Sequence, residues 1–204
     1  MSDDDNVTIC VFARAPVPGQ CKTRLAVQVG FHQAARIQAR LTQRAIATAV
    51  AAQAGKVVLW CAPDSRHPFF GRCRHEYGVG LRTQRGDDLG ERMHHTLRSY
   101  RRCLIVGTDC PALSPQHIAR AADALRSGAR LLFLPAEDGG YVLVGAEGPD
   151  ARLFRGIPWG SSQVMAKTRQ RIARLGLSHL EGQTLWDVDH PGDLLRARRE
   201  GIEI

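Results

Sequence analysis

Carboxylates, cations and glycines gather in four short stretches of this 204-residue sequence. They are RAPVPGQCKTR (14–24), GTDCP (107–111), AEDGGY (136–141) and WDVDHPGDL (186–194). Two separated carboxylate groups and a cationic loop are what Mg²⁺-assisted chemistry on a diphosphate requires, because the metal neutralises the phosphates and the cations stabilise the leaving group. The four stretches therefore predict a site for phosphate chemistry, provided that the fold brings them together.

The first stretch reads as a stiff, basic turn. Pro16 and Pro18 fix backbone angles, and Gly19 allows a sharp bend before Lys22 and Arg24. A pre-ordered loop with two cations and free N–H groups that leads into a helix can cradle a phosphate. Its spacing matches neither the P-loop nor the GxGxxG pattern, and the segment by itself favours a solvated basic turn.

The acidic stretches offer candidate metal ligands. Asp109 follows an apolar run, where it can hold a divalent cation, although an aspartate there can equally cap a helix or shape a turn. Asp187 and Asp189 alternate along an extended segment, so only one of them is expected to face the site. Pro191 then begins a helix, and Asp193 complements its dipole.

Two further stretches join secondary-structure elements. Asp-Gly-Gly in AEDGGY predicts a hairpin turn, in which Asp138 could orient a hydroxyl group or act as a base. In QRGDDLGERM (84–93), Asp87 or Asp88 caps a helix, while Gln84 and Gly86 could meet a nucleobase or ribose. Turn formation and capping alone would also explain these residues.

The elements that must position these residues read as an α/β fold. Apolar runs at 7–13, 56–62, 102–109, 130–136 and 141–146, with a weaker one at 80–84, predict strands. Helical periodicity appears between them, as in the apolar stripe Ile37, Leu41, Ala45 and Ala49, and Ser114 followed by Pro115 predicts the start of a helix. Because the strands are apolar throughout, we expect a mostly parallel sheet covered by helices on both faces, in one Rossmann-like three-layer domain over residues 1–204. Ligands of such folds bind beyond the carboxyl ends of the strands, where the polar stretches fall.

Composition narrows the class of protein. The net charge is +8, but only three of the 28 basic residues are lysines, and the arginines form no contiguous block, so a nucleic-acid partner is disfavoured. No apolar run reaches membrane-spanning length and the first residues are acidic, so we expect a cytoplasmic protein without a membrane partner. Six scattered cysteines fit small buried side chains in a reducing compartment. The oligomeric state is left open.

Six motifs in order carry a family resemblance: FARAPVPGQCKTRL, QRGDDLGERM, GTDCP, PAEDGGYVLVG, IPWGSSQV and DVDHPGDL. They resemble a bacterial transferase family of the GT-A-type nucleotide-diphospho-sugar transferase superfamily, labelled "transferase 1, rSAM/selenodomain-associated". The KTRL ending is also similar to that of small guanylyltransferases acting on phospholactate-type acids. The resemblance implies a GT-A-like domain, a nucleotide or nucleotide sugar lying across the first-strand loop, a small-molecule acceptor, and Mg²⁺ or Mn²⁺.

The resemblance also assigns residues. The metal ligands would be Asp109 and Asp189, and the phosphate-contacting, catalytic cations Lys22 and Arg24. Nucleotide contacts would come from Ala13, Arg14, Ala15, Lys22, Arg24, Gln84 and Gly86. Acceptor contacts would come from Glu137, Asp138, Gly139, Gly140, Tyr141 and Trp159, with Asp138 also catalytic. The sequence departs from the family at Arg14, Cys21 and His190, and the last of these affects the geometry next to Asp189.

Three hypotheses remain open. A glycosyltransferase would pass a sugar from a nucleotide-diphosphate sugar to an acceptor hydroxyl, with Asp138 or Glu137 as the base if the reaction inverts. A nucleotidyltransferase would join an NTP to a phosphorylated small molecule and release pyrophosphate, and extra cations such as Arg82 or Arg85 would hold the substrate phosphate. A non-catalytic nucleotide-binding or nucleic-acid-binding module would bind its ligand without turnover.

Overall fold

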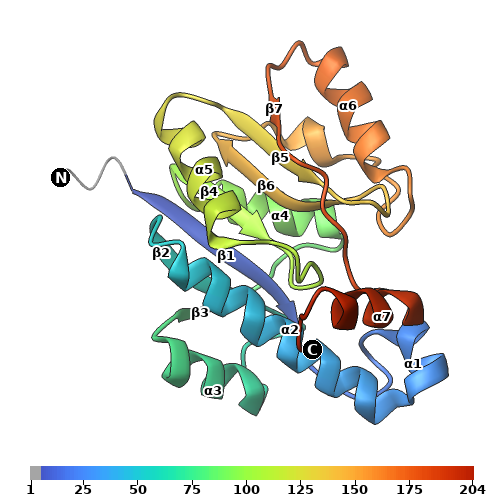
Figure 1. Ribbon diagram of the computed structural model, residues 1–204. Coiled ribbons are helices and arrows are strands. Elements are labelled where there is room, and N and C mark those ends of the chain that lie inside the picture. The colour runs from blue at the N-terminus through green and yellow to red at the C-terminus, as the bar shows by residue number, and fades with distance from the viewer. Residues whose placement is uncertain (1–5) are drawn as a thin grey trace.

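The apolar runs form one seven-stranded sheet in the computed structural model, which describes residues 6–204 (Figure 1). The strands are β1 (Val7–Arg14), β2 (Lys56–Ala62), β3 (Gly80–Thr83), β4 (Arg102–Val106), β5 (Leu131–Pro135), β6 (Tyr141–Glu147) and β7 (Leu180–Glu181), in the order β3-β2-β1-β4-β6-β5-β7. Strand β6 pairs antiparallel with β4 and β5, whereas the other neighbours pair parallel. The prediction of a mostly parallel sheet is confirmed.

Helices cover both faces of this sheet, as Figure 1 shows. The helices are α1 (Thr23–Val29), α2 (Phe31–Ala51), α3 (Pro68–Tyr77), α4 (Leu89–Leu97), α5 (Pro115–Arg126), α6 (Val164–Arg174) and α7 (Pro191–Arg199), with a 3₁₀ turn η2 (Ala151–Phe154). One face packs against α2, α3 and α5, and the other against α4, η2 and α6. The result is the three-layer α/β architecture that uniformly apolar strands require.

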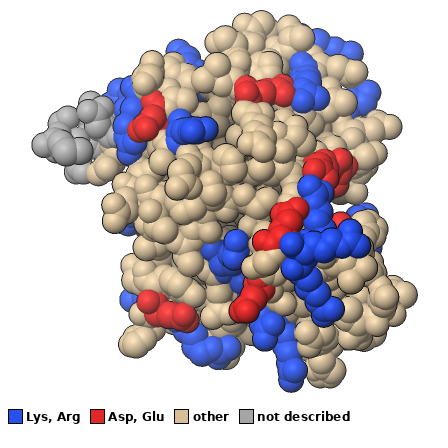
Figure 2. Space-filling view, in the orientation of Figure 1, with Lys and Arg blue, Asp and Glu red and all other residues tan. Residues whose placement is uncertain are grey.

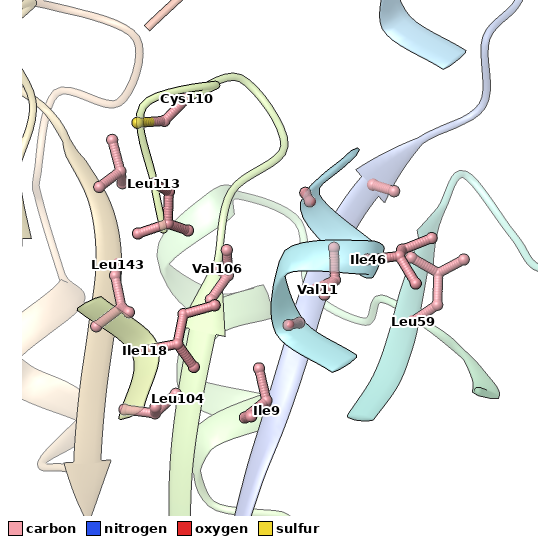
Figure 3. Packing of buried hydrophobic residues seen from close by; sticks show 14 of the residues in the cluster. Ile9, Val11, Ile46, Leu59, Leu104, Val106, Cys110, Leu113, Ile118 and Leu143 are labelled. Atoms are coloured by element: carbon pink, nitrogen blue, oxygen red, sulfur yellow. The ribbon is translucent and has the colours of Figure 1, made fainter. Parts of the chain in front are cut away.

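The central strand β1 shows why the predicted strands lack alternation. Ile9 and Val11 point into the cluster under α2 and α5, where Figure 3 shows them near Ile46 and Ile118. Cys10, between them, is buried in the cluster on the opposite face. Because both faces of the strand are covered, an apolar side chain is favoured at every position.

Local signals in the sequence fix the starts of three helices. The Ser114 side chain accepts a hydrogen bond from the His117 amide at the start of α5, and Asp88 does the same for the Glu91 amide at the start of α4. At α7, Asp193 reaches back to the His190 amide across 2.6 Å. The capping predictions are confirmed, and Asp193 supplies a cap that His190 would lack alone.

The cysteines and the helix lengths bear on what the composition predicted. All six cysteines carry free thiols and are buried, as small apolar side chains would be. Within residues 6–204 no helix combines the length and apolarity needed to span a membrane.

Candidate active site

A cleft of about 740 Å³ opens beyond the carboxyl ends of β1 and β4. Its walls come from the loop after β1, the loop after β4, the β5–β6 turn, the β6–α6 connection and the segment before α7. Of the residues predicted for the site, ten line it: Ala13, Arg14, Lys22, Gln84, Asp109, Asp138, Gly140, Tyr141, Trp159 and Asp189. The fold therefore brings the polar stretches together, as the positional rule for open α/β sheets implies.

Backbone hydrogen bonds hold the segment before α7 at this cleft. The Leu185 amide donates to the Pro135 carbonyl across 2.9 Å, and the Glu137 amide donates back to the Leu185 carbonyl. Three residues later, the Val188 amide donates to the Asp109 carbonyl across 2.8 Å. The chain is thus fixed to the end of β5 and to the loop after β4, which places Asp187 and Asp189 next to Asp109.

Lys22 lies at the centre of the acidic residues. Its Nζ is 2.8 Å from Oδ1 of Asp109 and 3.6 Å from Oδ1 of Asp189, and it donates a hydrogen bond to the Val188 carbonyl across 2.6 Å. The side chain is only 3% exposed. Its ammonium group therefore contacts three protein oxygens, two of them at hydrogen-bond distance, and Lys22 is an internal counter-ion that joins the two carboxylates.

The electrostatics of Lys22 agree with this position. Burial disfavours its charged form, but the charge and hydrogen bond of Asp109, with Asp189 and Asp187, outweigh the burial and raise the pKa of Lys22 above its usual range. Its backbone is left-handed, with φ of 47°. A non-glycine residue in this conformation indicates that the surrounding contacts hold it there.

Arg24 pairs with the same acidic segment from the surface. Its Nη1 donates to Oδ2 of Asp189 across 2.8 Å, and its side chain is 60% exposed. Arg24 does not line the cleft.

Negative charge remains in excess at this position. Burial raises the pKa of Asp187 to about 6, and the neighbouring carboxylates of Asp138, Asp109 and Asp189 act in the same direction, with Lys22 opposing them. Carboxylate oxygens are the donors that Mg²⁺ and Mn²⁺ prefer. Among the described residues, no three His, Cys, Asp or Glu side chains form a metal site on their own. The donor set fits a cation held by one or two carboxylates together with substrate phosphates and water, which is how Mg²⁺ usually binds.

The expectation that only one of Asp187 and Asp189 faces the site is wrong, because both line the cleft. Alternation applies to regular strands, and the backbone from Trp186 to Asp189 has no regular secondary structure.

The two acids of the β5–β6 turn have different partners. Asp138 lines the cleft, and its Oδ1 accepts the Gly140 amide across 2.7 Å. Glu137 instead forms a bidentate pair with Arg196 of α7, at 2.7 and 3.2 Å, and the Arg196 hydrogen bond lowers the pKa of Glu137. Figure 2 shows basic and acidic side chains interleaved on this side of the molecule. Glu137 is therefore held outside the cleft lining.

The turn is clamped to the β6–α6 connection. Gly139 has φ of +89°, and a side chain there would collide with the Ser162 carbonyl, while its own carbonyl accepts the Met165 amide across 2.7 Å. Gly139 thus lies behind the cleft wall and shapes it. On the wall itself, Trp159 packs edge-on against Tyr141, with ring centroids 6.4 Å apart.

The β3–α4 segment contributes Gln84 but not Gly86 to the cleft lining. Nε2 of Gln84 donates to the Trp60 carbonyl at 2.9 Å and to the Ala13 carbonyl at 3.5 Å, which leaves Oε1 as an acceptor. The Gly86 carbonyl accepts Nε of Arg92. Ala15 is also absent from the lining, because its amide extends the β1–β2 pairing to Ala62.

Sequence reasoning missed several residues of the lining. Thr108, next to Asp109, accepts a hydrogen bond from the buried Gln38 of α2 across 3.2 Å, and Arg92 projects from α4. Gln38 adjoins the predicted apolar stripe of α2, and a polar residue beside such a stripe is the signal that could have identified it. Arg92 carried no signal, because exposed arginines are frequent in this sequence.

Residues 45–161 match the model of a family described as uncharacterised proteins conserved in bacteria, DUF2064. This chain belongs to that family. A search of curated proteins finds no match to the sequence.

Solved structures show the same fold. A protein from Desulfovibrio desulfuricans G20, provisionally named a nucleotide-diphospho-sugar transferase, is 28% identical with a TM-score of 0.80, over 90% of this chain and 82% of its own. A Methanothermobacter nucleotidyl transferase is 16% identical with a TM-score of 0.63, over 96% and 97% of the two chains. Glucosyl-3-phosphoglycerate synthase from Mycobacterium tuberculosis, determined with Mn²⁺ and UDP, is 11% identical with a TM-score of 0.54, over 98% and 81%. The chain has the nucleotide-diphospho-sugar transferase fold that its motifs resemble.

Proposed function

We propose that this member of the family is a metal-dependent transferase that takes a sugar from a nucleotide-diphosphate sugar and passes it to an acceptor hydroxyl. The observation that carries the proposal is the contact of Lys22 with Asp109 and Asp189 in the lining of a cleft large enough for a nucleotide sugar. The 28% identical relative named as a nucleotide-diphospho-sugar transferase supports it.

Lys22 organises the acidic centre in this proposal. By holding Oδ1 of Asp109, it leaves Oδ2 of that residue available to Mg²⁺ or Mn²⁺, whereas Asp189 would bind the cation by giving up its exposed contact with Arg24. When bound, the cation would neutralise the donor diphosphate and stabilise the departing nucleotide. Because Lys22 already faces protein oxygens, we assign it to ordering this centre rather than to a direct grip on phosphate.

The part of the cleft lining around Gln84 suits the nucleoside. Oε1 of Gln84 is oriented by the two backbone carbonyls that accept its amide group, so it presents an acceptor to an N–H group of a base. Arg14 and Arg92 line the same cleft and bring positive charge to the diphosphate.

Asp138 is the candidate base for the acceptor hydroxyl. It lies in the cleft lining, whereas Glu137 is committed to Arg196. In an inverting reaction, Asp138 would accept the hydroxyl proton as the new glycosidic bond forms. Tyr141 and Trp159, on the adjoining wall, would contact the apolar face of the acceptor.

Nucleotidyl transfer is the second candidate. It is favoured by the Methanothermobacter nucleotidyl transferase, because the two chains overlap over nearly their whole lengths. A phosphorylated acceptor is already anionic and needs no base, so this reaction would not depend on Asp138.

The deciding experiment begins with a thermal-shift screen of NTPs and nucleotide sugars, each with Mg²⁺, Mn²⁺ or EDTA. Stabilising ligands are then assayed for release of nucleoside diphosphate and of pyrophosphate with hydroxyl-bearing and phosphorylated acceptors. Metal-dependent release of nucleoside diphosphate supports glycosyl transfer. Pyrophosphate release that requires a phosphorylated acceptor would replace it with nucleotidyl transfer, and binding without any turnover would contradict both.

A further inference from the structure

Arg82 and Arg85 do not line the cleft. They line a second groove of about 510 Å³, on the face of the sheet that α4 covers and next to the edge strand β3. No residue belongs to the lining of both. Two consecutive residues line different sites, because Gln84 lines the cleft and Arg85 lines the groove.

The groove carries positive charge that no acid neutralises. Its lining contains two arginines, a histidine and several hydroxyl groups but no carboxylate. Arg24, Arg169 and Arg196 each pair with an acid on the surface. Among the described residues, Arg82 and Arg85 have no such partner.

The histidine of the groove, His95, is affected by the positive charge of nearby arginines. Burial lowers the pKa of His95, and the charges of Arg98 and Arg85 lower it further. A neutral His95 at physiological pH can donate one hydrogen bond and accept another. Arg85 is therefore close enough to His95 to act on it, and the charge of Arg82 acts in the same way on Tyr100, so both arginines reach groups of the groove lining.

Hydrogen-bond donors and a rigid wall complete the groove. Oγ1 of Thr83 donates to Oγ of Ser65 across 3.4 Å, so the Ser65 proton stays available to a ligand. Trp60 forms the floor, with the rings of His95 and Tyr100 edge-on at 6.0 and 6.5 Å.

We propose that this groove is a second binding site, which takes a small phosphate-bearing anion between Arg82 and Arg85. Arginine side chains bind phosphate oxygens through paired N–H groups, and the volume suits a small molecule. Trp60 is 4% exposed, so its ring is not open to stacking with a base of a single strand. A phosphorylated small molecule or a short polyphosphate therefore fits better than nucleic acid. The site goes beyond the proposed function, which uses the cleft.

Isothermal titration without divalent metal tests the site with two probes, pyrophosphate for a polyphosphate and glycerol 3-phosphate for a phosphomonoester. The wild type is compared with Arg82→Ala/Arg85→Ala and with Arg174→Ala, which removes an exposed arginine of α6. We expect at least one probe to bind about tenfold or more weaker to the double variant, because two charge-assisted contacts are lost, and within about twofold of wild type to the control. The probe that binds identifies the source of the phosphate.

Circular dichroism should show the fold of the double variant unchanged, since both arginines are exposed. Equal affinities of wild type and double variant for both probes, or no binding of either probe, would overturn the proposal. So would loss of binding in Arg14→Ala but not in the double variant, because the anion would then occupy the cleft. Tighter binding of a short single-stranded oligonucleotide than of either probe, lost in the double variant, would reassign the groove to nucleic acid.

Discussion

The Val188 amide donates a hydrogen bond to the carbonyl oxygen of Asp109 across 2.8 Å. This bond fixes the segment before α7 to the loop after β4, and the Val188 carbonyl in turn accepts the ammonium of Lys22. Three parts of the chain, the first of them 166 residues before the last, therefore meet at one point. The acidic centre of the cleft depends on this junction.

Replacing Lys22 should destabilise the fold. In Lys22→Met the carboxylates of Asp109 and Asp189 lose a counter-ion that is 3% exposed. Because these carboxylates are 49% and 32% exposed and stay hydrated, we expect a loss of about 2 kcal/mol, which is typical of hydrogen bonds to charged groups. Denaturant unfolding measures the loss. The control Arg24→Ala removes a 60% exposed partner of the same acid and should cost less than about 1 kcal/mol. A smaller loss for Lys22→Met than for Arg24→Ala would contradict the counter-ion role.

Replacing Asp109 should abolish metal-dependent turnover. If Asp109 holds the cation, Asp109→Asn should lower kcat by about 10²-fold or more, as the loss of other key electrostatic groups does. The assay identified in the ligand screen measures this, together with the thermal shift produced by Mn²⁺. Asp123→Asn, on the exposed part of α5, is the matched control and should keep full activity. Normal metal-dependent turnover in Asp109→Asn would remove Asp109 from the site.

Substitutions of the two acids of the β5–β6 turn, Asp138 and Glu137, should have different effects on kcat. If glycosyl transfer is confirmed, Asp138→Asn should lower kcat with little change in the KM of the nucleotide donor, because a base acts only in the transition state. Glu137→Gln should keep kcat, since Glu137 pairs with Arg196 outside the cleft lining. The opposite pattern in steady-state kinetics would move the base to Glu137.

Gly139 should be more sensitive to substitution than another glycine with positive φ. In Gly139→Ala the new methyl group meets the Ser162 carbonyl, whereas Gly160, with φ of +80°, has open space around it. Backbone strain of about 1 kcal/mol or more is common to both variants, so the difference isolates the collision. Thermal unfolding should show Gly139→Ala to be the less stable of the two variants. Equal losses of stability in both variants would mean that the β6–α6 connection shifts away from the new methyl group without cost.

Lowering the pH should remove the contribution of the Arg169–Glu181 ion pair to the stability of the fold. The Arg169 hydrogen bond, with His179 in support, lowers the pKa of Glu181 to about 2 from a usual value of 4.5. A lowered carboxyl pKa stabilises the fold above pH 4.5, and this contribution is lost as the pH falls towards 2. Because the pair is partly exposed, Glu181→Gln should cost less than about 1 kcal/mol at pH 7 and nothing below about pH 2. Urea unfolding across this range tests the prediction, and a loss that does not change with pH would refute it.

Much of the architecture could be predicted from the residues themselves. The uniformly apolar run at β1 indicated burial on both faces, Ser114 and Asp88 marked the starts of helices, and Asp-Gly-Gly marked the turn between β5 and β6. These are local properties, because caps and turns involve residues within four positions of one another and burial on two faces leaves its pattern in a single strand.

The sequence by itself therefore determined the α/β class, the order of six of the seven strands and the polar stretches at the strand ends, but not the two-residue strand β7. Only the tertiary structure decided that Lys22 faces two carboxylates, that Asp187 joins Asp189 in the cleft, and that Arg82 belongs to a separate groove. Each of these depends on contacts between residues far apart in the chain or on the direction of irregular backbone. Periodicity carries no information about either, since it records which face of an element is buried but not what lies opposite that face.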